Sequence, residues 1–383
     1  TVAIIDAYAS PTIVADANAF SSAYGLPPVN LQQVVAPGTY RHPERGQKQD
    51  PQGWYGEETL DVEAVHAMAP GAKIVFIGAP NNFQDLDAAM NHAVDRHLAN
   101  IITNSYGFPT ELLPPGFIIP QEQIFMQAAA EGIGVYFSSG DGGDESATVG
   151  YVTPDWPAIS PFVTAVGGTS LGVGQANNYL FEVAWGTHKT TWDGKKWSPA
   201  APGPFLYGGG GGISRLFAQP SYQAGVVPSS ITTRAIPDVA MNGDPQTGFP
   251  VWESTTNPDG TVVISTTRYG GTSLSSPLFA GMMALADQQA GHPHGFANPA
   301  IYSRAGSGAF RDVGATPTSA LPGVPPSGKV AVLRNDCANA DCSAKITSLR
   351  TTNMDTSLAI APGWDDATGV GTPNGGAFVT GLP

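Results

Sequence analysis

Two groups of residues in this sequence have types and spacing suited to chemistry, and the first is acidic. Glu57, Glu58 and Asp61 lie in a stretch with apolar residues at helical spacing, so Asp61 is about one turn from either glutamate. Two carboxyl groups held that close do not both ionise easily, and one keeps a proton for general acid–base work below neutrality. Spacing alone does not choose between the two glutamates. Acidic residues in a first helical turn can also merely complement the helix dipole.

The second group is centred on Ser273, which follows a Gly-Gly-Thr turn and precedes an apolar helical stretch over residues 275–290. A serine at the start of a helix has backbone N–H groups and the positive end of the dipole beside it. This environment suits a nucleophile that attacks a carbonyl and creates an oxyanion. The alternative is an ordinary helix cap formed by one of the hydroxyl residues Thr272, Ser273 and Ser275.

The elements that must position these residues alternate along the chain. Short β-rich runs and stretches with helical spacing follow one another, which predicts an α/β fold: a parallel sheet with helices on both faces. The expected strands cover residues 1–6, 73–78, 100–105, 134–138 and 162–166, and the expected helices cover 15–24, 57–68, 85–98, 121–132 and 275–290. The looser, hairpin-like region over 172–267 is interpreted as excursions of the same domain, and the chain from 306 onward as irregular.

Composition narrows the class of protein. The 383 residues carry a formal net charge of −14, which argues against nucleic acid or an anionic membrane surface as a partner. No apolar run approaches the roughly 18 residues of a membrane span. Charged residues are 13% of the chain, about half the usual share of roughly 25%, which suits a protein that works in acid.

The two cysteines, Cys337 and Cys342, lie in one polar loop. We expect a local disulfide in an exported protein, with a pair of free thiols as the alternative.

The ordered motifs resemble the sedolisin family, the serine-carboxyl peptidases. The family pattern Glu-x-x-x-Asp, followed after one residue by an acid, matches Glu57, Asp61 and Glu63, and this selects Glu57 over Glu58. The Ser-Gly-Asp motif ends at Asp141 and the Gly-Thr-Ser motif ends at Ser273. Further matches lie at residues 2–8, 104–107, 157–169, 208–214 and 237–239. The resemblance therefore covers nearly the whole chain, and implies one subtilisin-like peptidase domain over 1–383 without its pro-region.

The resemblance also implies a role for each site residue. Ser273 would attack the scissile carbonyl while Glu57 accepts its proton and returns it to the leaving amine. Asp61 would orient Glu57 as the third member of a triad does. Asp141, kept protonated, would donate a hydrogen bond to the oxyanion, which predicts an acid-active enzyme.

Two rival interpretations remain open. A histidine-dependent subtilase is disfavoured because no His-Gly-Thr segment occurs, and we expect His66, in an apolar helical stretch, to be a core or surface residue. A catalytically inactive, peptide-binding relative is disfavoured because all four site residues are present. Asp6, which resembles the aspartate that ends the first strand of ordinary subtilases, is interpreted as structural.

A calcium site is a further implication of the resemblance. One Ca²⁺ ion would be held in a C-terminal region over about 306–383, since carboxylates and loop carbonyls are the ligands that calcium prefers. The ligands would be the side chains of Asp312 and Asp365 and the carbonyls of Val313, Ala361 and Gly363, with Ala361 standing where the family often has glycine.

The resemblance also predicts how the protein is made and what it meets. We expect a secreted, extracellular monomer that is made with an N-terminal pro-peptide and acts on polypeptide substrates.

Overall fold

A central sheet organises the computed structural model, which describes residues 1–35, 51–83, 85–257, 259–313, 331–339, 342–351 and 355–383. Eight strands of the described chain form this sheet, and all neighbours pair in parallel except one antiparallel edge strand, β7. In spatial order they are β13 (Val239–Asn242), β6 (Thr164–Val173), β5 (Gly134–Ser138), β4 (Ile101–Asn104), β1 (Val2–Ala7), β3 (Lys73–Ala79) and β2 (Asn30–Val35), with β7 (Tyr179–Ala184) beside β6.

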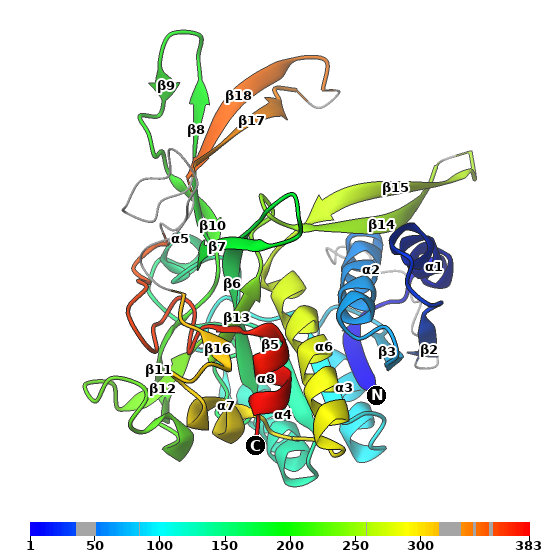
Figure 1. Ribbon diagram of the computed structural model, residues 1–383, viewed down its shortest axis with the longest axis vertical. Helices are drawn as coiled ribbons and strands as arrows, with labels where there is room; N and C mark the ends of the chain where they lie inside the picture. Colours follow the sequence, from blue (N-terminus) through cyan, green and yellow to red (C-terminus); the bar gives the residue numbers. More distant parts are fainter. Residues whose placement is uncertain (36–50, 84, 258, 314–330, 340–341, 352–354) are drawn as a thin grey trace.

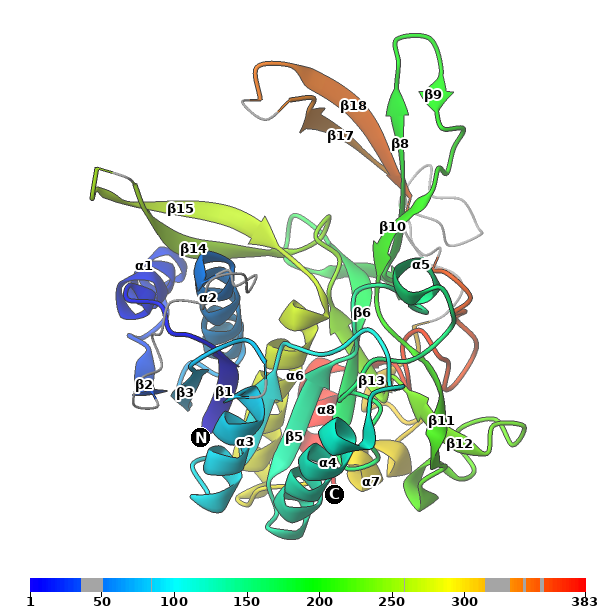
Figure 2. The same ribbon diagram turned by 180° about the vertical axis from the view of Figure 1, so that it is seen from behind.

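Helices cover both faces of this sheet (Figures 1 and 2). Alternate residues of a buried parallel strand face opposite layers, so its two faces are both apolar. In β1, Ile4 packs into the layer with α2 (Pro51–Met68) and α6 (Thr272–Ala290), whereas Ile5 packs into the layer with α3 and α4. The other helices are α1 (Ile13–Tyr24), α3 (Asp85–Asp95), α4 (Pro115–Ala130), α5 (Ser146–Val149), α7 (Asn298–Ser303) and α8 (Gly375–Gly381), with a 3₁₀ turn, η1 (Ser221–Gln223). The predicted α/β fold is confirmed.

Two β-arms project from one end of the sheet, above the ends of β5 and β6 in Figure 1. The first is the sheet β10-β8-β18-β17, with β9 paired to β8; the second is the hairpin of β14 and β15. Their bounds are β8 (Gly186–Trp192), β9 (Trp197–Ser198), β10 (Phe205–Gly208), β14 (Phe249–Thr256), β15 (Val262–Tyr269), β17 (Ala331–Cys337) and β18 (Lys345–Thr351). The short pairs β11 (Gly212–Ala218) with β12 (Thr233–Ile236) and β16 (Phe310–Arg311) with β19 (Thr372–Pro373) complete the described strands.

The expectation of irregular chain after residue 306 is wrong. β17 and β18 form a regular hairpin, and β18 also pairs with β8, which is more than 150 residues earlier in the chain. Pairing across that separation is decided by tertiary contact, which local periodicity does not report. The expected disulfide between Cys337 and Cys342 is confirmed at the end of this hairpin. None of the described helices is long and apolar enough to cross a membrane.

Candidate active site

The candidate residues come together where the parallel strands end. Ser105 directly follows β4, and Asp141 lies three residues after β5, at the carboxyl edge of the sheet where α/β proteins bind ligands. Ser273 is the second residue of α6, and Glu57 lies on α2, which packs along α6. A small cavity of about 230 Å³ opens here and is lined by Gly53, Trp54, Glu57 and Ser105.

Ser273 and Glu57 form the first contact of the site. The Ser273 side chain hydrogen-bonds to the Glu57 carboxylate, and both residues are half-buried. Burial raises the pKa of Glu57 to about 7, against the lowering effect of the Ser273 hydrogen bond and with a further rise from the charge of Asp141. A carboxyl with a pKa near neutrality can both take and return a proton, which a general acid–base group must do.

Asp61 lies one helical turn after Glu57 on α2 and is fully buried. The Ser105 hydroxyl lies 2.8 Å from one Asp61 carboxylate oxygen and 3.0 Å from the other. Burial raises the pKa of Asp61 well above its usual range, and the nearby charge of Glu57 raises it further. Sequence reasoning did not assign Ser105 to this contact. Its signal is a polar residue placed directly after a buried parallel strand.

Asp141 holds the start of α6 and faces the nucleophile. Its Oδ1 accepts hydrogen bonds from the Thr272 N–H at 2.7 Å and from the Thr272 hydroxyl at 3.0 Å. Gly271 has φ +96°, and a Cβ there would lie 2.8 Å from Asp141 Oδ2, so glycine is required by both backbone and space. Desolvation by the surrounding protein raises the pKa of Asp141, although the residue as a whole is exposed, and the Thr272 hydrogen bonds lower it. Among described hydrogen bonds none reaches Oδ2, which leaves that oxygen available for a proton.

The structure distinguishes Glu57 from Glu58, which their spacing from Asp61 in the sequence did not. Glu58 is fully buried and accepts a hydrogen bond from the Ser10 N–H, on the side of α2 that faces β1. His66 is also buried, with its Nε2 3.0 Å from the Ser21 hydroxyl and 3.0 Å from a backbone carbonyl. Neither side chain hydrogen-bonds to Ser273 in the described structure.

Buried carboxyl groups extend well beyond the candidate triad. Asp6, at the end of β1, is fully buried with both side-chain oxygens unpartnered among described residues, and burial and the charges of Asp61, Glu57 and Glu58 raise its pKa. Burial raises the pKa of Glu58 well above its usual range and that of Glu63 to about 9. None of these five groups has a cationic partner within ion-pair distance in the described structure. Asp6, interpreted from sequence as structural, therefore belongs to an acidic cluster around the site.

We expect this cluster to make the fold most stable in acid. Each of its groups has a folded pKa above the unfolded value, so its stabilising effect is complete below the unfolded pKa and is lost as pH rises through the folded pKa. For Glu63 the loss begins near the unfolded value of 4.5 and continues to about 9. Each such group lowers the free energy of unfolding by up to about 1.4 kcal/mol per pH unit.

Urea unfolding between about pH 4 and pH 8 measures this slope. Glu63→Gln should make the fall with pH shallower, and Glu131→Gln, at an exposed position, should leave it unchanged. Stability that rises toward neutral pH in the unmodified chain would contradict the prediction.

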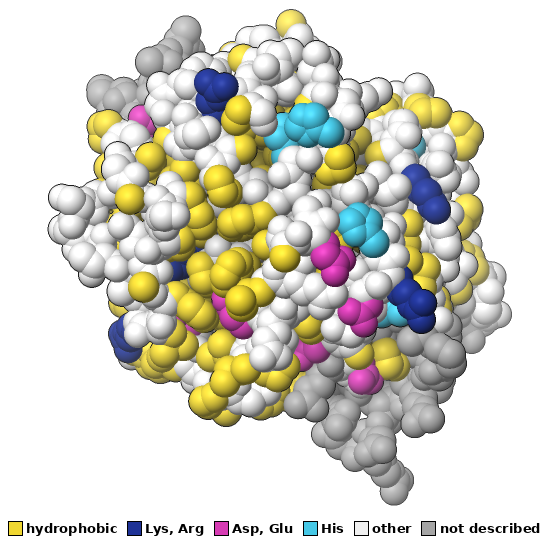
Figure 3. Space-filling model, turned by 90° about the horizontal axis from the view of Figure 1, so that it is seen from below, with side chains coloured by type: hydrophobic (Ala, Val, Ile, Leu, Met, Phe, Trp, Pro, Cys, Tyr) yellow, Lys and Arg dark blue, Asp and Glu magenta, His cyan; other side chains and the backbone are white. Residues whose placement is uncertain are grey.

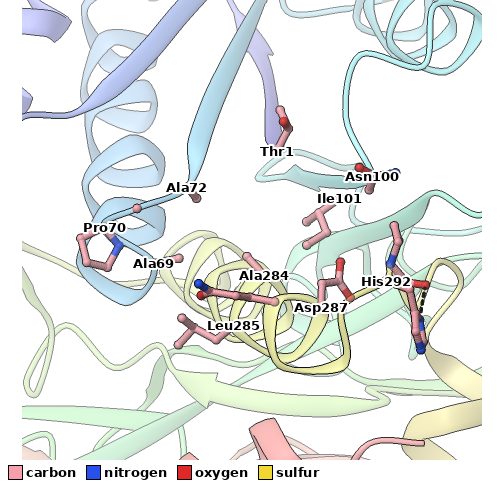
Figure 4. A pocket seen from close by; sticks show the side chains of 14 residues that line it. Thr1, Ala69, Pro70, Ala72, Asn100, Ile101, Ala284, Leu285, Asp287 and His292 are labelled. Carbon is pink, nitrogen blue, oxygen red and sulfur yellow. Dashed lines mark hydrogen bonds between the residues drawn. The ribbon is translucent and has the colours of Figure 1, made fainter.

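A second, larger cavity among the described residues does not belong to this site. It has a volume of about 670 Å³ and lies at the opposite end of the sheet, beside Thr1 and the last turn of α6 (Figure 4). Figure 3 shows hydrophobic side chains gathered over that end of the molecule, and the labelled polar side chains of Figure 4 include Asp287 and His292. None of the four candidate catalytic residues lines it.

The predicted calcium ligands lie around one short segment. The Gly363 N–H donates to Asp312 at 2.7 Å, and the Ala361 N–H donates to Asp365 at 3.1 Å, so two carboxylates bracket residues 361–363. Val313 follows Asp312 directly. Every predicted donor is an oxygen, which fits calcium. Among described residues no three His, Cys, Asp or Glu side chains are grouped to hold a metal, so backbone carbonyls would have to supply the remaining ligands.

Comparison with known proteins finds similarity to several peptidases. The model of the subtilase family matches residues 34–301. Kumamolisin of Bacillus sp. (strain MN-32) is 34% identical over 335 residues, covering 85% of this chain and 50% of that protein. Sedolisin of Pseudomonas sp. (strain 101) is 31% identical, covering 79% of this chain and 49% of that protein. The chain thus spans about half the length of these relatives.

A solved structure agrees in fold. That structure is Pseudomonas sedolisin, a serine-carboxyl proteinase, complexed with two molecules of pseudo-iodotyrostatin. It superposes with a TM-score of 0.71 at 26% identity, covering 97% of this chain and 89% of that one. The chain is also similar, at 29% identity, to the tripeptidyl-peptidase 1 of Canis lupus familiaris, covering 85% of this chain and 50% of that protein.

Proposed function

Because the chain belongs to the subtilase family and, within it, to the sedolisins, we propose that it is a serine-carboxyl peptidase that hydrolyses peptide bonds in acid. One observation carries the proposal: the Ser273 hydroxyl hydrogen-bonds to Glu57, whose charge acts on Asp61, and Asp141 lies beside the start of α6. No histidine in the described structure hydrogen-bonds to the nucleophile, which supports a carboxylate as the base.

The mechanism follows from these contacts. As the Ser273 oxygen attacks the scissile carbonyl carbon, its proton passes to Glu57, and the carbonyl oxygen becomes an oxyanion. Asp141, protonated at Oδ2, and the Ser273 N–H donate hydrogen bonds to that oxyanion. Glu57 then gives its proton to the leaving amine, the C–N bond breaks, and an acyl-enzyme remains. Water deprotonated by Glu57 releases the acid product and restores the serine.

Asp61 and Ser105 act as positioning residues. Burial and the nearby charge of Glu57 raise the pKa of Asp61, so the two neighbouring carboxyl groups share a proton, and the Ser105 hydroxyl holds Asp61 in place. The pair therefore exchanges one proton in the acid to neutral range, where Asp141 must still be protonated. Acid activity is the consequence.

The proposal also covers the substrates, the origin and the assembly of the protein. Polypeptides are the substrates, and the working form is a secreted, extracellular monomer released from its own pro-peptide.

One Ca²⁺ ion stabilises the C-terminal region in this proposal. The side chains of Asp312 and Asp365 and the carbonyls of Val313, Ala361 and Gly363 would hold it, and its charge would offset the two carboxylates. The ion supplies stability and takes no part in bond cleavage.

Chelation tests this site through unfolding. Removal of Ca²⁺ by EGTA should lower the melting temperature of the unmodified chain by several degrees, since a ligand that binds only the folded state stabilises it. Asp312→Asn should lower the melting temperature and abolish its response to calcium. An unchanged melting temperature after chelation would contradict the calcium site.

The activity itself is tested by a pH profile and by labelling. Cleavage of an internally quenched peptide should be confined to acid, and a hydroxyl-directed reagent should label Ser273 in the unmodified chain but not in Glu57→Ala. Labelling that is indifferent to Glu57, with a neutral optimum, would point to a histidine base. If the chain showed neither cleavage nor labelling, the alternative of a catalytically inactive, peptide-binding relative would be favoured.

A further inference from the structure

The β14–β15 arm presents a free strand edge beside the candidate active site. Residues 262–268 of β15 are all exposed, and among described strands β15 pairs only with β14. Three consecutive apolar residues lie on it: Val262 is 57% exposed, Val263 51% and Ile264 41%. A long, exposed, apolar edge strand is a template for pairing with another extended segment.

The other edge of the arm is anchored to the domain. On β14 the Trp252 N–H donates to the Glu63 carboxylate at 3.0 Å, and the Ser254 N–H donates to Asp16 at 3.2 Å. These two buried carboxylates, from α2 and α1, accept the backbone hydrogen bonds that a neighbouring strand would otherwise accept. The arm is therefore fixed on its inner edge, and its outer edge is held in a constant position toward solvent (Figures 1 and 2).

The free edge leads directly into the catalytic centre. β15 ends at Tyr269, and Ser273 follows four residues later at the start of α6. Eight residues of strand extend about 26 Å at roughly 3.3 Å per residue. A substrate chain that leaves the cleft along β15 therefore stays in contact with the protein well beyond the peptide bond that is cut.

Positive charge gathers at the base of the two arms. Arg268 of β15 donates to the backbone carbonyl of Gln246 at 3.0 Å, and Arg334 of β17 donates to the Gln246 side-chain oxygen at 3.0 Å. Both arginines are exposed. Arg268 has no carboxylate within ion-pair distance in the described structure, and Arg334 lies 3.9 Å from one oxygen of Asp336. In a chain of net charge −14, this is a local site for an acidic side chain.

We propose that the outer edge of β15, with Arg268 and Arg334 at its base, binds an extended stretch of the polypeptide substrate by strand addition. The edge supplies main-chain hydrogen bonds, its apolar side chains contact the bound segment, and the arginines select acidic side chains. The occupant is an unfolded, acidic polypeptide longer than the cleft itself. The inference rests on the proposed peptidase function and deepens it by naming the substrate class.

Binding to an inactive variant tests the edge independently of turnover. The probe is reduced, carboxamidomethylated α-lactalbumin, an acidic protein that is unfolded without its disulfides, and its binding to Ser273→Ala is followed by fluorescence anisotropy. Addition of Val263→Lys and Arg268→Glu should raise the Kd at least about tenfold, because charge at the edge opposes strand pairing and the arginine site is reversed. Ile119→Lys, which changes a 55% exposed apolar residue on α4, is the matched control and should not change the Kd.

Turnover gives the second readout. In the active chain, the two arm substitutions should lower kcat/KM for the unfolded protein relative to kcat/KM for an octapeptide, again by about tenfold. An unchanged Kd, or an equal fall for both substrates, would overturn the proposal. The proposal would also be overturned if the substitutions converted a dimer of the chain to a monomer and left the Kd unchanged. The edge would then be a contact with a second copy of the chain. If the unmodified chain cleaves no octapeptide at any pH, the peptidase function fails while the binding readout still decides the edge.

Discussion

Ser273→Ala and Glu57→Gln should each lower kcat by about 10⁴-fold or more, because each removes one half of the proton transfer that starts the reaction. Ser273→Ala leaves no oxygen to attack the carbonyl. Glu57→Gln keeps the shape of the side chain beside Ser273 but cannot accept its proton. The double variant should be little worse than either single variant, since the two groups act as a unit. Steady-state cleavage of a quenched peptide at the acid optimum measures all three.

Two buried neighbours serve as controls for this prediction. Glu58→Gln changes the adjacent carboxyl, which bonds Ser10 instead of the nucleophile, and His66→Gln changes the histidine nearest in sequence. Both should keep kcat within about tenfold, even where stability falls. A loss of kcat in His66→Gln that matches the loss in Glu57→Gln would contradict a carboxylate base.

Asp141→Ala should lower kcat by about 100–1000-fold, the usual effect of removing one oxyanion donor. Asp141→Asn should lose much less, because the amide oxygen can accept the Thr272 hydrogen bonds while the amide nitrogen donates from the position of Oδ2. The comparison separates donation to an oxyanion from simple capping of α6.

The pH profile gives a sharper test of Asp141. Its pKa is raised, so the donor is present below that pKa and is lost as the carboxyl ionises at higher pH. An amide does not ionise, and Asp141→Asn should therefore extend activity toward neutral pH relative to the unmodified chain. Identical upper limits in the two pH profiles would exclude Asp141 as the ionising donor. Thermal unfolding of both variants checks that the start of α6 remains folded.

Much of the fold could be predicted because it depends on local periodicity. The runs that became β1, β3, β4 and β5 are short and apolar, and helical spacing identified α2 and α6 before any contact was known. β2 was missed because it is an edge strand with mostly exposed or half-buried residues, which weakens the apolar signal. The hairpin-like excursions predicted over 172–267 hold β8, β9, β10 and the β14–β15 hairpin, whereas β17 and β18 escaped prediction because β18 pairs with β8 across more than 150 residues.

For the candidate site, too, some features depend on neighbours in the sequence and others on tertiary packing. Sequence alone determined which carboxyl groups share a helix with Asp61 and that a serine follows a glycine turn, since both depend on neighbours in the chain. Only the tertiary structure decided that Glu57 faces Ser273 while Glu58 bonds Ser10, because the packing of α2 between β1 and α6 sets which side of that helix meets the cleft.

Tertiary structure also decided the environment of each group. Ser105 reaches Asp61, and Gly271 admits Asp141, only because strands β4 and β5 end beside α6. The raised pKa values of Glu57, Asp61 and Asp141 have desolvation by the surrounding protein as their main cause, and that desolvation is created by segments far apart in sequence. Residue type and spacing therefore determined which groups could do the chemistry, and packing decided which of them hold protons where the reaction needs them.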